Sequence, residues 1–205
     1  MRNRFKSNDV MGGYGMLRIL ALLAVLGVPS AHAAKYTIDK EHSNVAFKIR
    51  HLASRVPGSF TDFSGSFEFS EKDPQKSSLE TVIQVASINT RNADRDGHLR
   101  TADFFDADKF PTATFKSAKV AGAGKDRFKV NGVLNLHGVE KPVVLDVEYL
   151  GTAKNFKGKT TAGFSAKGKF NRKDFGIVWN KVLDTGSAIL GDEVELSIEV
   201  EALQD

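Results

Sequence analysis

The chain of 205 residues has no cysteine, a single tryptophan and no long hydrophobic run. Without cysteine it can form no disulfide, build no thiolate metal site and carry no lipid on a cysteine side chain. Its longest apolar stretch, residues 19–28, spans ten residues. That is half of the roughly 20 that a membrane-spanning helix needs.

Residues 1–33 have the pattern of a secretory signal peptide. Arg18 precedes the apolar stretch, and Ala31-His-Ala33 supplies the small residues of a cleavage site. This arrangement is typical of the three regions of such a leader. We therefore predict export to the periplasm as a soluble protein that is not a lipoprotein, with Ala34 as its first residue.

The net charge of +4 belongs largely to this leader. The chain has 29 basic and 25 acidic residues, and four basic residues and one acidic residue lie in 1–33. The remaining 25 and 24 give a net charge of +1. A net charge so close to zero provides no excess of positive charge to attract nucleic acid, so we predict no nucleic-acid partner. The 172 residues of 34–205 suffice for one domain without a metal or disulfide.

Apolar and polar residues alternate along most of the chain after Ala34. The clearest case is 194–202, where apolar residues alternate with glutamate and serine. Residues 45–50 and 143–149 behave alike, and further strands are expected at 56–70, 80–88, 112–120, 127–137 and 159–171. Strands with one apolar and one wet face predict an all-β antiparallel fold. A sandwich and a closed barrel both fit, and the barrel is favoured because closure removes exposed edges.

Residues 91–111 are charge-dense and do not alternate. We predict one long connection with short helical turns, whose candidate N-caps are Asn92, Asp103 and Asp106. Pro111 is expected to end this connection before the next strand.

Phenylalanine dominates the aromatic residues of the predicted barrel. Beyond the leader there are 14 phenylalanines, two tyrosines and Trp179. Phenylalanine adds apolar area without a polar group, so composition alone favours a filled core. The alternative is the lining of an apolar ligand cavity, because an eight-stranded barrel can either be filled or hold a small ligand.

The histidines of 34–205 do not form a recognisable site. His42, His51, His98 and His137 have no partner at metal-ligand spacing, so no metal and no cofactor is predicted. His42-Ser43 and Asp96-Gly-His98 contain the residue types of a hydrolytic triad, but no serine lies in a Gly-x-Ser-x-Gly turn. Hydrogen-bonded residues at an end of the barrel are the favoured interpretation.

An ordered series of short motifs carries a resemblance. They are Tyr36-Thr-Ile-Asp39, His42-Ser-x-Val-x-Phe47, His51, Gly58-x-Phe60, Ser87-Ile-x-Thr90, Asp96-x-His-Leu-Arg100, Asp103-Phe-Phe-Asp106, Phe110-Pro111, Phe115-Lys-Ser117, Gly132-x-Leu-x-Leu-His-Gly138 and Arg172-x-Asp-Phe-Gly176. In this order they resemble the YceI-like family of polyisoprenoid-binding periplasmic proteins. The resemblance runs from about Tyr36 to Ala202.

The resemblance implies an extended, lipocalin-like antiparallel β-barrel of about eight strands and no catalysis. It implies an apolar tunnel that holds a polyisoprenoid or similar long-chain amphiphile for transport, storage or sequestration. Cavity lining then becomes the favoured role of the aromatic residues. By strand parity we expect these residues to contact the tail: Val45, Phe47, Ile49, Phe60, Phe115, Leu134, Leu145, Phe164, Leu196 and Ile198. The expected donors to a polar head are Arg91, Arg95, His98 and Arg100.

Two other functions stay open. One is an enzyme acting on an isoprenoid or other amphiphile, with His98 as general base and Asp96 orienting it. The other is a secreted scavenger of small hydrophobic compounds. The lipid carrier is expected to be a monomer or homodimer, and transient membrane contact is compatible with it.

Overall fold

The computed structural model describes residues 33–184 and 186–205. The predicted signal peptide and its cleavage site therefore lie almost wholly outside the described residues. No helix within the described ranges is long and apolar enough to cross a membrane.

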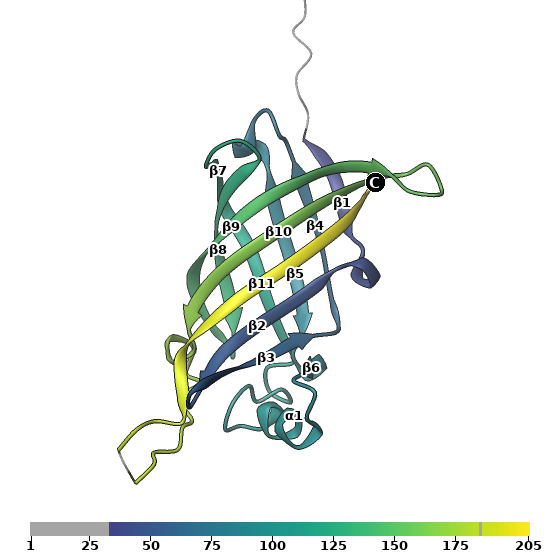
Figure 1. The fold of residues 1–205 in the computed structure, drawn as a ribbon. Helices are drawn as coiled ribbons and strands as arrows, with labels where there is room; N and C mark the ends of the chain where they lie inside the picture. The colour runs from purple at the N-terminus through teal and green to yellow at the C-terminus, as the bar shows by residue number, and fades with distance from the viewer. Residues whose placement is uncertain (1–32, 185) are drawn as a thin grey trace, which may run out of the picture. The chain divides into compact units, whose positions relative to one another are not determined.

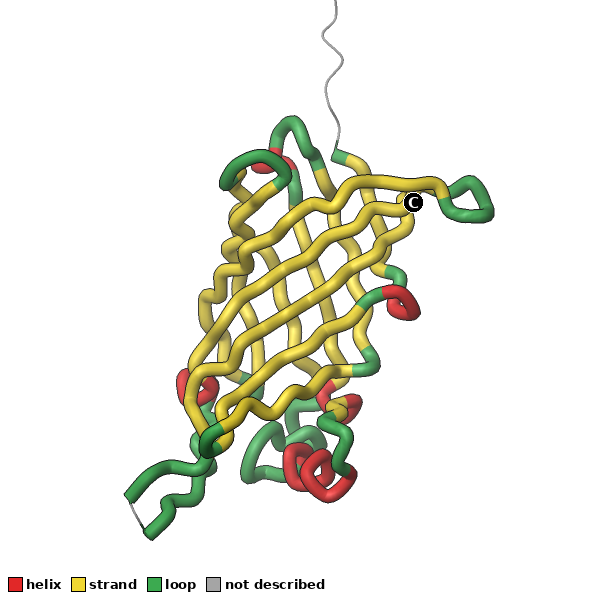
Figure 2. Tube along the Cα trace, in the orientation of Figure 1, coloured by secondary structure: helices red, strands yellow, loops and turns green. Residues whose placement is uncertain are grey.

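Eight antiparallel strands close into a barrel (Figures 1 and 2). In barrel order these strands are β1 (Ala34–Ile38), β4 (Phe63–Phe69), β5 (Ser78–Gln84), β7 (Thr112–Gly122), β8 (Arg127–Leu136), β9 (Val139–Lys154), β10 (Thr160–Asn171) and β11 (Leu190–Gln204). The ring closes where β11 pairs with β1, at Tyr36 opposite Gln204. The prediction of an all-β antiparallel barrel is confirmed.

The strand beside β11 is divided in two. The last residues of β11 pair with β1, and its segment Leu190–Glu199 pairs with β2 (Asn44–His51). Between β1 and β2 lies the short 3₁₀ helix η1 (Lys40–His42). At this break the Ser43 hydroxyl accepts from the backbone N–H of Glu201 at 3.0 Å and donates to its carbonyl at 3.1 Å. A side chain thus replaces the missing backbone pairing.

One end of the barrel is extended by further short elements. β3 (Ser54–Phe60) pairs with β2, and the two-residue β6 (Ile88–Asn89) pairs with β3. α1 (Ala93–Arg100) follows β6 and lies below this end in Figure 1. We call it the α1 end. The C-terminus and the β9–β10 hairpin lie at the opposite end (Figure 1).

The connection 91–111 contains one helix. Asn92 caps α1, since its side chain accepts from the backbone N–H of Arg95 at 2.9 Å. The other two predicted caps are wrong, because no helix begins at Asp103 or Asp106. Asp103 binds His98 instead, and Asp106 has a left-handed φ of 47° within a series of turns. Pro111 directly precedes β7, as predicted.

Two of the predicted strands are divided in the structure. The expected strand 56–70 is the β3–β4 hairpin, and 80–88 ends as β5 at Gln84, followed by η3 (Val85–Ser87). The backbone N–H of Gln84 binds the carbonyl of Asp62, and that of Val85 binds the carbonyl of Pro111, so the pairing of β5 with both neighbours reaches the start of η3. Two further 3₁₀ turns, η2 (Pro74–Lys76) and η4 (Arg172–Phe175), were not predicted. Apolar–polar alternation does not mark these breaks, because the 3₁₀ turns are held by short-range hydrogen bonds such as that from the Ser87 hydroxyl to the carbonyl of Gln84.

Candidate functional site

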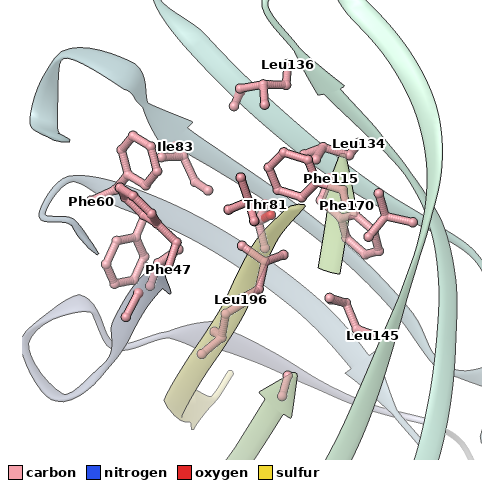
Figure 3. Close-up of a pocket in the computed structure, with 18 of the residues that line it drawn as sticks. Phe47, Phe60, Thr81, Ile83, Phe115, Leu134, Leu136, Leu145, Phe170 and Leu196 are labelled. Atoms are coloured by element: carbon pink, nitrogen blue, oxygen red, sulfur yellow. The ribbon is translucent and has the colours of Figure 1, made fainter. Parts of the chain in front are cut away.

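The barrel encloses a cavity of about 500 Å³ (Figure 3). This volume lies within the range of about 300–1,000 Å³ for small-molecule sites. Inward-facing side chains from most of the strands line it, and nearly all of them are aliphatic or aromatic. The outward positions between them carry charges, for example Glu195 and Lys169. The cavity can therefore exclude water from an apolar ligand, whereas the outer face stays hydrated.

All ten residues expected to contact a lipid tail lie on the cavity wall. Phe47, Phe60, Phe115, Leu134, Leu145 and Leu196 are labelled among them in Figure 3. Parity placed them correctly because β-strand side chains alternate strictly between the two faces. Their contact with a ligand stays a prediction.

Glycines at inward positions leave room for this cavity. Gly58, Gly65, Gly132 and Gly168 share the inward parity of their strands, and at each a large side chain from another strand lies where a Cβ would be. Phe115 covers Gly132, and Leu145 covers Gly168. A large side chain that lies against the wall in this way takes less of the barrel interior than one that projects across it.

Aromatic rings fill the barrel toward the end opposite α1. Phe69 contacts Phe128, Tyr149 and Phe164 with ring centroids 4.9–5.5 Å apart. The Phe67 ring packs between the rings of Phe164 and Tyr36. Burial raises the pKa of the Tyr36 hydroxyl. These rings pack against one another and narrow this part of the barrel, and Phe67, Phe69, Phe128 and Phe164 also line the cavity.

Polar donors meet the cavity at the α1 end. Arg95 and His98, both exposed to solvent, also line the cavity, so the cavity has a mouth at this end, and exposed Glu68 and Ser78 line it at the other. Arg95 is held by Thr90, whose hydroxyl accepts from Arg95 Nε at 2.7 Å and whose carbonyl accepts from an Arg95 terminal nitrogen at 2.8 Å. Buried Asp96 fixes Thr90 in turn by accepting from its hydroxyl and its backbone N–H. The network positions one guanidinium between the cavity and solvent.

The proposed enzymatic pairing of Asp96 with His98 is wrong. The Asp96 carboxylate binds Thr90, whereas His98 Nε2 lies 2.8 Å from Asp103. The reason is the helix geometry, since residues two apart on a helix do not face each other.

Arg91 and Arg100, the other two predicted head-group donors, do not line the cavity. Arg100 donates to the carbonyls of Ala86 and Ile88 and so holds the segment before α1. Arg91 has a left-handed φ of 61°, and its backbone N–H binds the side chain of Asn89. The structure therefore brings only Arg95 and His98 of the four to the cavity mouth.

Known proteins share this closed antiparallel barrel and much of its sequence. The YceI-like domain family matches residues 36–202. The chain belongs to this family. A UPF0312 protein of Azotobacter vinelandii is 44% identical over 184 residues, which cover 88% of this chain and 93% of that protein.

Solved structures agree with this assignment. The Campylobacter jejuni YCEI protein is 38% identical, with a TM-score of 0.64 over 74% of this chain and 86% of that one. A domain from Saccharophagus degradans, described as a polyisoprenoid binding domain implicated in plant cell wall breakdown, is 18% identical. Its TM-score of 0.60, over 85% of this chain and all of that one, shows the shared fold.

Sequence reasoning missed a buried arginine beside the mouth. Arg172, whose side chain is 3% exposed, lines the cavity and donates to the carbonyls of Gly191, Ile177 and Trp179 at 2.7–2.9 Å. Burial lowers the pKa of Arg172, and the nearby charge of Asp192 opposes this effect. Arg172 thereby ties the segment after η4 to β11.

Trp179 was also missed as a site residue. It lines the cavity and packs edge-on against His98 and at a tilt against Phe104, with ring centroids about 5 Å apart. Its segment has no strand alternation, so parity could not assign its direction. The one feature of the sequence that could have drawn attention to Trp179 is that it is the only tryptophan of the chain.

Within the described residues, one cluster of possible metal ligands lies beside η1, away from the cavity. The ligand atoms of Asp39, His42 and Glu201 lie within 4.8 Å of one another. Asp39 already accepts from the backbone N–H of Glu41 and binds His42 Nδ1 at 2.9 Å. These hydrogen bonds account for the arrangement, and we assign no ion to it.

Proposed function

We propose that this protein is exported to the periplasm and holds the tail of a polyisoprenoid or similar long-chain amphiphile inside its barrel. The observation that carries the proposal is the apolar cavity of about 500 Å³, with polar groups gathered at its mouth. Membership of the YceI-like family and the shared fold with a polyisoprenoid binding domain support it. The signal-peptide pattern of residues 1–33 supports the location.

The polar groups at the mouth give the ligand a direction. The tail points toward the cluster of Phe67, Phe69 and Phe164, and an oxygen-rich or anionic head lies beside Arg95 and His98. Arg95 keeps unbonded guanidinium N–H groups after its two bonds to Thr90. Charge-assisted hydrogen bonds from such groups are roughly twice as strong as neutral ones.

Tail burial and head recognition have different roles. Moving a tail of about forty carbons from water into an apolar cavity, at ~0.8 kcal/mol per methylene, would release roughly 30 kcal/mol of transfer free energy. That exceeds the ceiling of about 20 kcal/mol for non-covalent complexes, so tail ordering must offset much of it. A single methylene discriminates by only ~1–3 kcal/mol, which leaves selectivity to the head.

We propose a binding role without catalysis. His98, the candidate base, is paired with Asp103 at the exposed end of the mouth, and Asp96 is committed to Thr90. Asp103 and Asp96 thus both serve to position the residues of the mouth.

A scavenger of small hydrophobic compounds is the second candidate, because the cavity volume also suits a drug-sized molecule. Titration of delipidated protein separates the two. A fluorescent polyprenyl alcohol should bind at one site per barrel, and an unlabelled polyprenyl alcohol should displace it far better than a small apolar dye. Stronger displacement by the dye, or no polyprenyl binding, would reject the lipid carrier.

A further inference from the structure

The β9–β10 hairpin has a surface that the cavity does not explain. Its tip, Lys154–Lys159, stands clear of the barrel at the end opposite α1 (Figures 1 and 2). Phe156, at this tip, is fully exposed at 111% of its reference area, the highest value among the exposed large apolar residues. Leu150, on the β9 arm of the hairpin, is 61% exposed.

The charge around Phe156 has one sign. Lys154, Lys157 and Lys159 surround it, and residues 149–160 contain no aspartate or glutamate. Within the part of the chain that the structure describes, none of these three lysines forms an ion pair. Lys154 donates to the hydroxyl of Thr160, and Lys159 is close enough to Asp205 to contribute to the lowered pKa of that carboxyl.

The turn that presents Phe156 is well ordered by its own hydrogen bonds. The Asn155 side chain accepts from the backbone N–H groups of Lys157 and Lys159, both at 3.0 Å. The backbone of Asn155 also pairs with Lys159 and Gly158, and Gly158 takes the left-handed φ of 74° that the turn requires. The backbone of the turn is therefore fixed, and it presents the Phe156 ring to solvent.

We propose that this hairpin tip docks the protein on a lipid surface that carries anionic headgroups. An aromatic ring flanked by lysines suits the boundary between headgroups and acyl chains, where the ring is buried and the ammonium groups meet phosphates. A stable protein partner would need about 800 Å² from each side, which a six-residue tip does not offer. Docking through this tip leaves the mouth at the α1 end uncovered.

Vesicle flotation tests the inference. The protein is expressed from the full chain in a Gram-negative host and purified in the form that the cell produces. It is mixed with phosphatidylcholine vesicles that contain either no phosphatidylglycerol or about 30% of it, which gives the vesicles a negative surface potential. Wild type should float with the anionic vesicles, and salt above the physiological range should weaken binding. Phe156→Ser should reduce partitioning about tenfold, and Lys154→Gln/Lys157→Gln/Lys159→Gln on the order of a hundredfold.

Matched controls carry the same changes elsewhere. Val182→Ser removes another exposed apolar side chain, and Lys109→Gln/Lys141→Gln/Lys181→Gln, at exposed lysines away from the hairpin, has the same net charge as the hairpin variant. Both should float like wild type. Equal binding to neutral vesicles, or equal loss in the controls, would overturn the inference. So would a concentration-dependent dimer that the hairpin variants abolish, because the occupant would then be a second copy of the chain. Cavity binding should be unchanged in every variant, which separates this test from that of the proposed function.

Discussion

Phe47 lies over Gly58, its partner on the neighbouring strand. A Cβ at Gly58 would lie 2.3 Å from Cζ of Phe47, and the three atoms nearest to it would all belong to the Phe47 ring. Because Gly58 has no side chain, the Phe47 ring can rest against the barrel wall at this position. The openness of the cavity thus depends on a pair of residues from two strands.

Gly58→Ala should push the Phe47 ring into the cavity without unfolding the barrel, since the three atoms nearest to the added Cβ all belong to this side chain, which can rotate. We expect lower lipid capacity with little change in thermal stability. Gly132→Ala meets the Phe115 ring and also the backbone carbonyl of Lys116 at 2.6 Å. It should cost about 1–3 kcal/mol of stability.

Gly122→Ala is the matched strand control for these two variants, since the nearest atom to its added Cβ is 3.9 Å away. Thermal unfolding and the yield of co-purified lipid measure both effects. Equal lipid content in Gly58→Ala and Gly122→Ala would contradict the role of the Phe47–Gly58 pair.

Phe47→Asp should abolish lipid retention, because an unpaired carboxylate in the apolar cavity is strongly disfavoured. Val144→Asp, on the outer face of β9 where Val144 is 43% exposed, should retain lipid. Lipid extraction of both purified proteins makes the comparison. Full lipid content in folded Phe47→Asp would count against the cavity as the site.

Arg95→Gln should weaken binding of a polyprenyl phosphate by about ten- to a hundredfold, the effect of one lost charge-assisted hydrogen bond at roughly 1.5–3 kcal/mol. Binding of a polyprenyl hydrocarbon without a head should change little. Thr90→Val should act in the same direction, since Thr90 positions the guanidinium. Thr101→Val, which removes a hydroxyl at the end of α1, is the control. Equal losses for both ligands would show that Arg95 does not contact the head.

Arg172→Lys should destabilise the barrel by about 3–5 kcal/mol, because a lysine cannot satisfy the three carbonyls that the guanidinium binds. Urea unfolding measures the change, and Lys173→Gln, at an exposed neighbour, should lie within about 0.5 kcal/mol of wild type. A small effect of Arg172→Lys would mean that other contacts hold the segment after η4.

The Asp39–His42 pair should give a pH dependence. The hydrogen bond that the His42 ring donates to the Asp39 carboxylate raises the pKa of His42 above 6.5, and the same bond lowers the pKa of Asp39 below 3.8. The His42 contribution to stability is fully present below pH 6.5 and is lost as the pH rises through the raised pKa. The Asp39 contribution is present above pH 3.8 and is lost as the pH falls through the lowered pKa.

The pair is therefore most favourable between about pH 4 and 6. An NMR titration should show that Asp39→Asn returns the His42 pKa toward 6.5. Glu41→Gln, which leaves the hydrogen bond in place, should keep it raised. An unchanged His42 pKa in Asp39→Asn would contradict the assigned cause.

The barrel and its inner face could be predicted because β-sheet parity is local. The alternation of Val194, Leu196 and Ile198 fixes which side of β11 is buried, and the structure agrees. The choice between a filled core and a cavity was also encoded, in inward glycines such as Gly58 and Gly132, but reading that signal requires knowing which ring faces each glycine.

The mouth was less predictable because distant segments build it. Asp96 was expected beside His98 and instead binds Thr90 before the helix. Arg172 reaches carbonyls on both sides of a segment that has no repeating pattern. Hydrogen-bond partners of this kind are decided by tertiary packing, which spacing along the chain does not reveal.

Native mass spectrometry of the protein purified without detergent tests the central claim most directly. We predict one adduct per barrel, which organic extraction resolves into a single polyprenyl species and which Phe47→Asp lacks. A folded wild-type protein at its unliganded mass, or a heterogeneous set of small adducts that persists in Phe47→Asp, would contradict the account.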